Sequence, residues 1–150
     1  MFHPSTVAKI ALSAMLCAFI ALARDHKDYN GTWTLLPERS DFAGQPPIQS
    51  GTVTIKDGED SVVVERRFTY GDAGITYFYR DTIASTHGGT VHAAKDVKSK
   101  TKWDHDILRI TTTQPNGVTE ESYSLTNEGL LQIDIEKPGG APTRLVFARQ

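Results

Sequence analysis

Apolar and polar residues alternate along most of the chain beyond residue 50, as they do in strands that bury one face of a sheet. The clearest case is the run LQIDIE at residues 131–136, where Leu131, Ile133 and Ile135 occupy every second position. The run VVVERRFTY at residues 62–70 follows the same rule, except that Arg66 falls among the apolar positions. No helical period interrupts these runs, so the pattern predicts an all-β domain.

Turn residues separate the runs at intervals of about 8–12 residues, a spacing typical of antiparallel meanders. Asp57-Gly58 and Asn116-Gly117 supply the positive φ angles that tight hairpins require. The pattern predicts ten strands, at residues 30–36, 52–56, 61–70, 74–82, 90–94, 98–104, 107–113, 118–125, 130–137 and 143–149. Closure would remove the edge strands that so regular a meander exposes. We therefore predict an antiparallel up-and-down barrel of about 8–10 strands.

Two segments before residue 51 break the alternating pattern. Residues 37–50 (PERSDFAGQPPIQS) contain three prolines, and no strand can run through Pro46-Pro47. We predict a loop there, with one helical turn at residues 38–41. Residues 24–29 are polar and are predicted to form a loose lead-in to the first strand.

The first 23 residues are predicted to be a signal peptide that is not part of the fold. Lys9 precedes an apolar run of 14 residues at positions 10–23, and Ala21 and Ala23 are the small residues that a signal peptidase recognises. The run is too short to span a hydrocarbon core of about 30 Å as a helix. We predict cleavage after Ala23 and location in the periplasm or outside the cell. An uncleaved anchor is the alternative; lipidation of Cys17 is disfavoured by the bulky residue before it.

Composition limits the partners of the mature chain, residues 24–150. Its 127 residues suit one domain that holds itself together by burial. Loss of Lys9 takes the formal net charge from −2 to −3, so no basic field favours nucleic acid or an anionic membrane surface. Cys17 is the only cysteine and leaves with the signal peptide, so the mature domain has no disulfide. We expect a monomer without a transmembrane segment or cofactor.

The front of the first predicted strand carries a motif shared with known barrels. Gly31-Thr32-Trp33, followed by a β-meander with an arginine in its last strand, resembles the calycin superfamily of lipocalins and fatty-acid-binding proteins. With Arg39-Ser40-Asp41-Phe42 and Lys102-Trp103-Asp104, the chain is more closely similar to small exported lipocalin-like proteins of bacteria. In lipocalins the tryptophan of the Gly-x-Trp motif closes one end of the barrel beneath an arginine of the last strand. The resemblance implies this role for Trp33 and Arg149, or Arg144 in place of Arg149.

Arg66 is the most informative candidate for a binding residue. It shares a strand face with Val62, Val64, Phe68 and Tyr70, and a guanidinium in such surroundings is costly unless it meets an anion. An internal ion pair is one reading, with Asp81 of the next strand as its partner. The other is a ligand carboxylate held inside the barrel.

Aromatic residues around Arg66 would form the wall of such a binding site. Tyr77 and Tyr79 share a face of the neighbouring strand and would lie across the hairpin. Trp103 shares a face with Ser99 and Thr101, and small hydroxyl residues beside an inward indole leave room for a cavity. The predicted ligand-binding residues are Arg66, Phe68, Tyr70, Tyr77, Tyr79 and Trp103.

Established catalytic and metal-binding signatures are missing from the sequence. Asp134 and Glu136 share a strand face, but that face is opposite the apolar one and is predicted to be the wet outside. No spacing places two of the histidines remaining in the mature chain on one face, so we predict no metal site. These histidines are His26, His87, His92 and His105.

The sequence thus leaves three classes of function open. The leading hypothesis is an exported protein that binds or carries a small apolar or amphipathic molecule. The second is a structural or interaction domain whose interior is filled by side chains. The third is a lipocalin-like enzyme, which the absence of catalytic signatures disfavours. A cavity would separate the first from the second, and a cluster of buried groups with perturbed pKa values would favour the third.

Overall fold

The computed structural model describes residues 25–59, 61–82, 90–91 and 96–150. Ten strands and two single-turn 3₁₀ helices follow one another in this part of the chain. Their bounds are η1 His26–Tyr29, β1 Gly31–Leu35, η2 Pro37–Arg39, β2 Ser50–Asp57, β3 Ser61–Tyr70, β4 Ala73–Thr82, β5 Thr90–Val91, β6 Lys98–Asp104, β7 Ile107–Gln114, β8 Gly117–Leu125, β9 Leu131–Glu136 and β10 Thr143–Arg149. The predicted signal peptide and most of the predicted strand at 90–94 lie outside the described residues.

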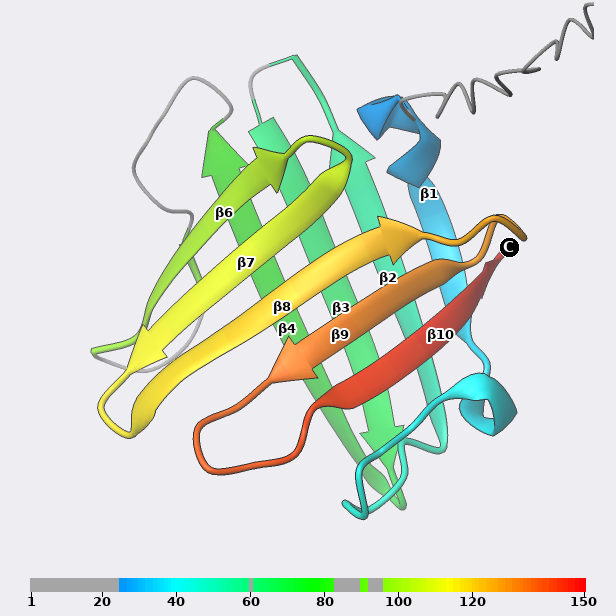
Figure 1. The fold of residues 1–150 in the computed structure, drawn as a ribbon, viewed down its shortest axis with the longest axis vertical. Coiled ribbons are helices and arrows are strands. Elements are labelled where there is room, and N and C mark those ends of the chain that lie inside the picture. Colours follow the sequence, from blue (N-terminus) through cyan, green and yellow to red (C-terminus); the bar gives the residue numbers. More distant parts are fainter. Residues whose placement is uncertain (1–24, 60, 83–89, 92–95) are drawn as a thin grey trace, which may run out of the picture.

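The strands form one antiparallel sheet in the order β5-β4-β3-β2-β1-β10-β9-β8-β7-β6. Strand β1 joins the two halves of the sheet because it pairs with both β2 and β10. The sheet curls so that β6–β10 cross in front of β1–β4 (Figure 1). Strand β6, at one end of the sheet, lies next to β4 and β5 at the other. The fold is therefore the predicted antiparallel, lipocalin-like barrel.

Alternation along the strands sets the core. In β9 the buried residues are Leu131, Ile133 and Ile135, with the polar residues between them turned outward, as predicted. Strand β3 buries every second residue from Val62 to Phe68, which places Arg66 inside the barrel. A sheet curled on itself needs this period of two, because the inward side chains of all strands meet in one core.

Trp33 and Arg149 lie together at one end of the barrel, which we call the closed end. The two residues are direct partners in the β1–β10 register. The Arg149 guanidinium lies over the buried Trp33 ring, with its Cζ 4.3 Å from the ring centroid. It also donates hydrogen bonds to the backbone carbonyls of Asp28 and Asn30. Gly31 permits this approach: its φ is +130°, and a Cβ there would lie 2.9 Å from Arg149 Nη1.

The lead-in before β1 is ordered, contrary to the prediction of a loose segment. Asp25 caps η1 by accepting a hydrogen bond from the Lys27 backbone N–H at 3.0 Å. The Tyr29 side chain is buried, and its carbonyl accepts a 2.9 Å hydrogen bond from Trp33 Nε1. Asn30 is held to β2 by two hydrogen bonds, which we call the Asn30–Asp57 clasp. Its side chain accepts a hydrogen bond from the Asp57 N–H and donates one to the Asp57 carbonyl. Hydrogen bonds hold this segment in place, and they leave no trace in the spacing of apolar residues on which the prediction relied.

The loop between β1 and β2 is tied down near its start, and its predicted helical turn appears as η2. Ser40 Oγ donates to the Leu36 carbonyl and accepts from the Val146 N–H. Asp41 forms an isolated bridge with Arg144 of β10. Among the described residues, no helix has the length and apolar character needed to cross a membrane.

Candidate ligand-binding site

A cavity of about 400 Å³ lies inside the barrel. Its buried lining comes from both walls: Ile48, Arg66, Phe68 and Tyr79 on one side, and Thr112, Thr119, Glu121, Ile135 and Leu145 on the other. Exposed residues mark its outer part, which we call the open end: Gln45, Pro46, Asn116, Lys137 and Pro138. A space of this size and mixed character matches sites for small organic molecules, which occupy about 300–1,000 Å³.

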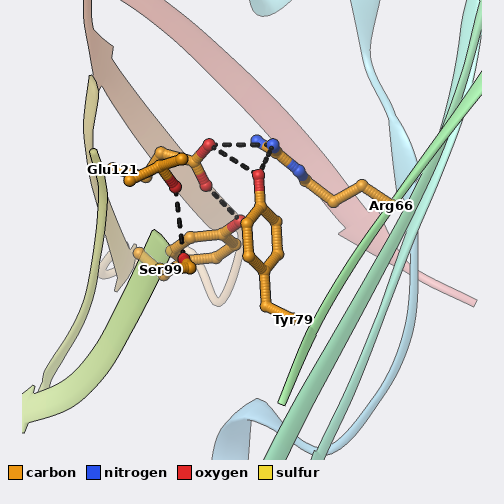
Figure 2. Close-up of polar contacts among 6 residues, drawn as sticks. Arg66, Tyr79, Ser99 and Glu121 are labelled. Carbon is orange, nitrogen blue, oxygen red and sulfur yellow. Dashed lines mark hydrogen bonds and ion pairs between the residues drawn. The ribbon is translucent and has the colours of Figure 1, made fainter. Parts of the chain in front are cut away.

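Arg66 and Glu121 form an ion pair across the interior, as Figure 2 shows. Arg66 comes from β3 and Glu121 from β8, and Arg66 Nη2 lies 2.8 Å from Glu121 Oε1. Both residues are only 3% exposed. The carboxylate partner of Arg66 is therefore Glu121 and not Asp81. In the β3–β4 register Arg66 lies opposite Tyr77, and the Asp81 backbone lies opposite Val62, four positions farther along.

Two tyrosine hydroxyls complete this polar cluster. Tyr79 Oη accepts a 2.7 Å hydrogen bond from Arg66 Nη2 and donates to Glu121 Oε1 at 3.3 Å. Tyr123 Oη donates to the other carboxylate oxygen, Oε2, at 2.9 Å. Both Glu121 oxygens thus have protein donors, which is what a buried carboxylate needs to remain charged.

The cluster stabilises the charged form of Arg66 and the neutral forms of Tyr79 and Tyr123. Burial alone would lower the pKa of Arg66, but the charge of Glu121 and the neighbouring tyrosines outweigh it, so the pKa lies above its ordinary value. Burial raises the pKa values of Tyr79 and Tyr123, and the Glu121 charge adds to the effect while Arg66 opposes it. The guanidinium is therefore charged and both phenols are neutral near pH 7.

Among the residues that the structure describes, part of the Arg66 guanidinium has no hydrogen-bond partner. Nε and Nη1 are buried, and neither meets an acceptor, while Nη2 serves both Glu121 and Tyr79. Aromatic rings surround the group, with its Cζ 4.6 Å from the Tyr77 centroid, 5.2 Å from Tyr79 and 5.5 Å from Phe68. Such rings attract the cation but give its N–H groups no in-plane acceptor. Unpaired donors beside a cavity are where a ligand can form hydrogen bonds.

Five of the six predicted ligand-binding residues line the cavity: Arg66, Phe68, Tyr70, Tyr77 and Tyr79. The sixth, Trp103, is not among its described lining residues. Its ring stacks on His26 with 3.8 Å between centroids and meets the Tyr29 ring edge-on at 5.1 Å. Trp103 therefore packs against η1, which precedes the closed-end residue Trp33. Alternation correctly put it on the face of Ser99 and Thr101, but a strand face does not tell how far along the barrel a residue lies.

Glu121 was not selected from the sequence as the partner of Arg66. The sequence signal was weak: Thr119, Glu121 and Tyr123 occupy alternate positions in β8, and the structure buries all three. Without a large apolar run, the two faces of this strand look equally polar in the sequence. The outward neighbour Glu120 is exposed.

The remaining candidates lie apart from the cavity. Asp134 faces outward, where its Oδ1 accepts a 2.7 Å hydrogen bond from Arg144 Nε, and Glu136 is exposed. Among the residues that the structure describes, no three His, Cys, Asp or Glu side chains gather as a metal site would require. His87 and His92 lie outside the described residues.

No family model and no curated protein matches the sequence. Solved structures do match in fold. The fluorescent protein UnaG aligns with a TM-score of 0.61 at 14% identity, over 84% of this chain and 100% of that one. A point mutant of the REP1-NXSQ fatty acid transporter gives 0.57 at 17% identity, over 82% and 98%. The fatty-acid-binding protein of Manduca sexta gives 0.53 at 14% identity, over 79% and 98%. This likeness supports the calycin-type fold.

Proposed function

We propose that this protein binds a small, mostly apolar molecule inside its barrel and carries it in the periplasm or outside the cell. The observation that carries the proposal is the cavity of about 400 Å³, with an aromatic and aliphatic wall and one buried polar cluster. Such a wall provides affinity by burying apolar ligand surface, and a few fixed polar groups provide orientation. The structural neighbours with this fold include a fatty acid transporter and a fatty-acid-binding protein, which supports the same class of function.

The cavity also weighs against the interaction-domain hypothesis, which supposes an interior filled by side chains. Thr112 and Thr119 occupy inward positions of β7 and β8 where larger residues would close the space. Protein cores are normally packed with few voids larger than a water molecule. Small residues around a space of this size are better explained by a ligand.

The buried cluster gives little support to an enzymatic function, although the pKa values of Arg66, Tyr79 and Tyr123 are perturbed. Arg66 is held in its charged form, and Tyr79 and Tyr123 are held in their neutral forms. A general acid or base works best with a pKa near the operating pH. These three groups move away from that range, so we favour binding over catalysis.

Two measurements test the proposal. Native mass spectrometry of protein purified from its own host should reveal a retained small molecule. After its removal, the neutral dye Nile red should bind saturably at one site per barrel. The two tryptophans are poor reporters, because neither Trp33 nor Trp103 is among the described lining residues, so dye emission should be followed.

Two substitutions on neighbouring positions of β8 locate the site. Thr119→Phe places a ring in the cavity and should reduce dye affinity by at least about tenfold. Val118→Phe is the matched control, because Val118 is 44% exposed and outside the described lining. Equal affinities for the two variants, each checked by thermal unfolding, would contradict a site inside the barrel. Absence of saturable binding to the wild-type protein would favour the interaction-domain hypothesis.

A further inference from the structure

Among the described residues that line the cavity, the positive and negative charges in the buried part cancel. Arg66 and Glu121 are the two charged residues there among the described lining, and they pair with each other. Lys137, the remaining charged residue of that lining, lies exposed at the open end. A carboxylate bound next to Arg66 would therefore leave a net negative charge in a buried site, close to Glu121. That arrangement is costly, because like charges repel strongly where water is excluded.

The hydrogen-bond geometry of Arg66 points the same way. A guanidinium holds a carboxylate most strongly through two parallel N–H groups, on either the Nε/Nη2 edge or the Nη1/Nη2 edge. Both edges include Nη2, which already donates a hydrogen bond to Tyr79 Oη and forms the ion pair with Glu121 Oε1. The unpaired atoms Nε and Nη1 do not share an edge. Each can donate to a single acceptor oxygen, but the two cannot form the paired contact of a carboxylate.

We propose that the cavity selects uncharged ligands whose carbonyl oxygen, of an ester, amide or ketone, accepts a hydrogen bond from Nε or Nη1 of Arg66. This inference rests on the proposed function and specifies the ligand class of the same site. A carbonyl ligand satisfies a buried donor without adding charge, and its apolar part lies against Phe68 and Tyr77. Glu121 acts as the selectivity residue, since its charge repels acids. Of the two sequence-based readings of Arg66, this inference keeps the internal ion pair, with Glu121 in place of Asp81, and sets aside the ligand carboxylate.

A series of ligands with one chain length tests the inference on the wild-type protein. Methyl decanoate, N-methyldecanamide and sodium decanoate should each compete with Nile red at neutral pH. The ester and the amide should compete at least about tenfold more strongly than the acid, which is ionised under these conditions. Decanoate competing as strongly as the ester would overturn the inference and leave the proposed function intact. Failure of all three ligands and of the dye to bind would overturn both.

Glu121→Gln then tests the origin of the selectivity. The amide keeps the size of the side chain but removes the charge, so Arg66 becomes an uncompensated cation. The affinity ratio of decanoate to methyl decanoate should rise by about tenfold or more. Glu120→Gln, the exposed neighbour on the outer face of β8, makes the same chemical change and should leave the ratio within about twofold of wild type. An unchanged ratio in folded Glu121→Gln protein would overturn the role assigned to Glu121.

Discussion

At the scale of single residues, the absence of a side chain at Gly31 allows Arg149 to pack over Trp33 at the closed end. A side chain at φ +130° is strained, and a Cβ would crowd Arg149 Nη1 at 2.9 Å. Gly31→Ala should therefore reduce the free energy of unfolding by about 1–3 kcal/mol, measured by denaturant titration. Gly74→Ala in β4 is the control, since its Cβ would meet nothing within 4 Å and it has no positive φ. Equal effects of the two substitutions would show that Gly31 is not a constrained position.

A second prediction at this scale concerns the alkaline titration of Tyr79 and Tyr123. Their folded-state pKa values lie above the ordinary value of about 10, because burial penalises the phenolate. The neutral, buried phenols make their full contribution to the free energy of unfolding below about pH 10. This contribution is lost as the pH rises through the pKa values that the two tyrosines have in the folded protein. In an absorbance titration, Tyr79→Phe and Tyr123→Phe should remove signal from the most alkaline part of the curve. Signal lost around the ordinary tyrosine pKa would contradict the burial of these hydroxyls.

At the scale of elements, β1 connects the two halves of the sheet and carries Trp33 into the core. Trp33→Ala would leave a large void and remove the ring beneath Arg149, so it should destabilise the protein by about 3–5 kcal/mol. Chemical unfolding of the variant and of the exposed-site control Val118→Ala measures the difference. A loss below about 1 kcal/mol for Trp33→Ala would mean that β1 does not organise the barrel.

Predictability from the sequence differs among the elements for a physical reason. Strands β3 and β9 were readily predicted, because alternation of large apolar residues reports directly on burial. The turn η1 was missed, since capping and side-chain hydrogen bonds at Asp25 and Asn30 leave no periodic signal. In the candidate site, alternation placed Arg66 inside but could not identify Glu121, 55 positions later in the sequence, as its partner. That pairing depends on how β3 and β8 face each other after closure.

At the scale of the whole molecule, the Arg66–Glu121 ion pair links the two walls of the barrel. The two residues come from strands that are not neighbours in the sheet order, so the pair spans the interior between β3 and β8. A buried pair of this kind is weak evidence for stability by itself, since desolvation opposes the attraction. The position of the pair instead determines where a bound ligand contacts charged groups. Elsewhere the two walls of the cavity present mainly apolar and hydroxyl-bearing side chains.

Export remains a prediction for the whole chain. If the first 23 residues are a signal peptide, the intact mass of protein recovered from the periplasm or medium should correspond to a chain that begins at Arg24. A mass that includes Met1 would exclude cleavage, and a lipid attached at Cys17 would indicate an anchored form. Arg24 immediately precedes the cap residue of η1, so cleavage there would leave the described lead-in intact.

The clasp between Asn30 and Asp57 has a consequence for the order of events during synthesis. Asn30-Gly31-Thr32 has the sequence of an N-glycosylation acceptor, and glycosylation would modify the side-chain nitrogen that donates to the Asp57 carbonyl. Folding therefore withdraws the acceptor from a glycosylating enzyme, and a sugar attached beforehand would obstruct the docking of Asn30 on β2. In a host that glycosylates such sites, the two processes would compete, and the faster one would decide which form of the protein accumulates.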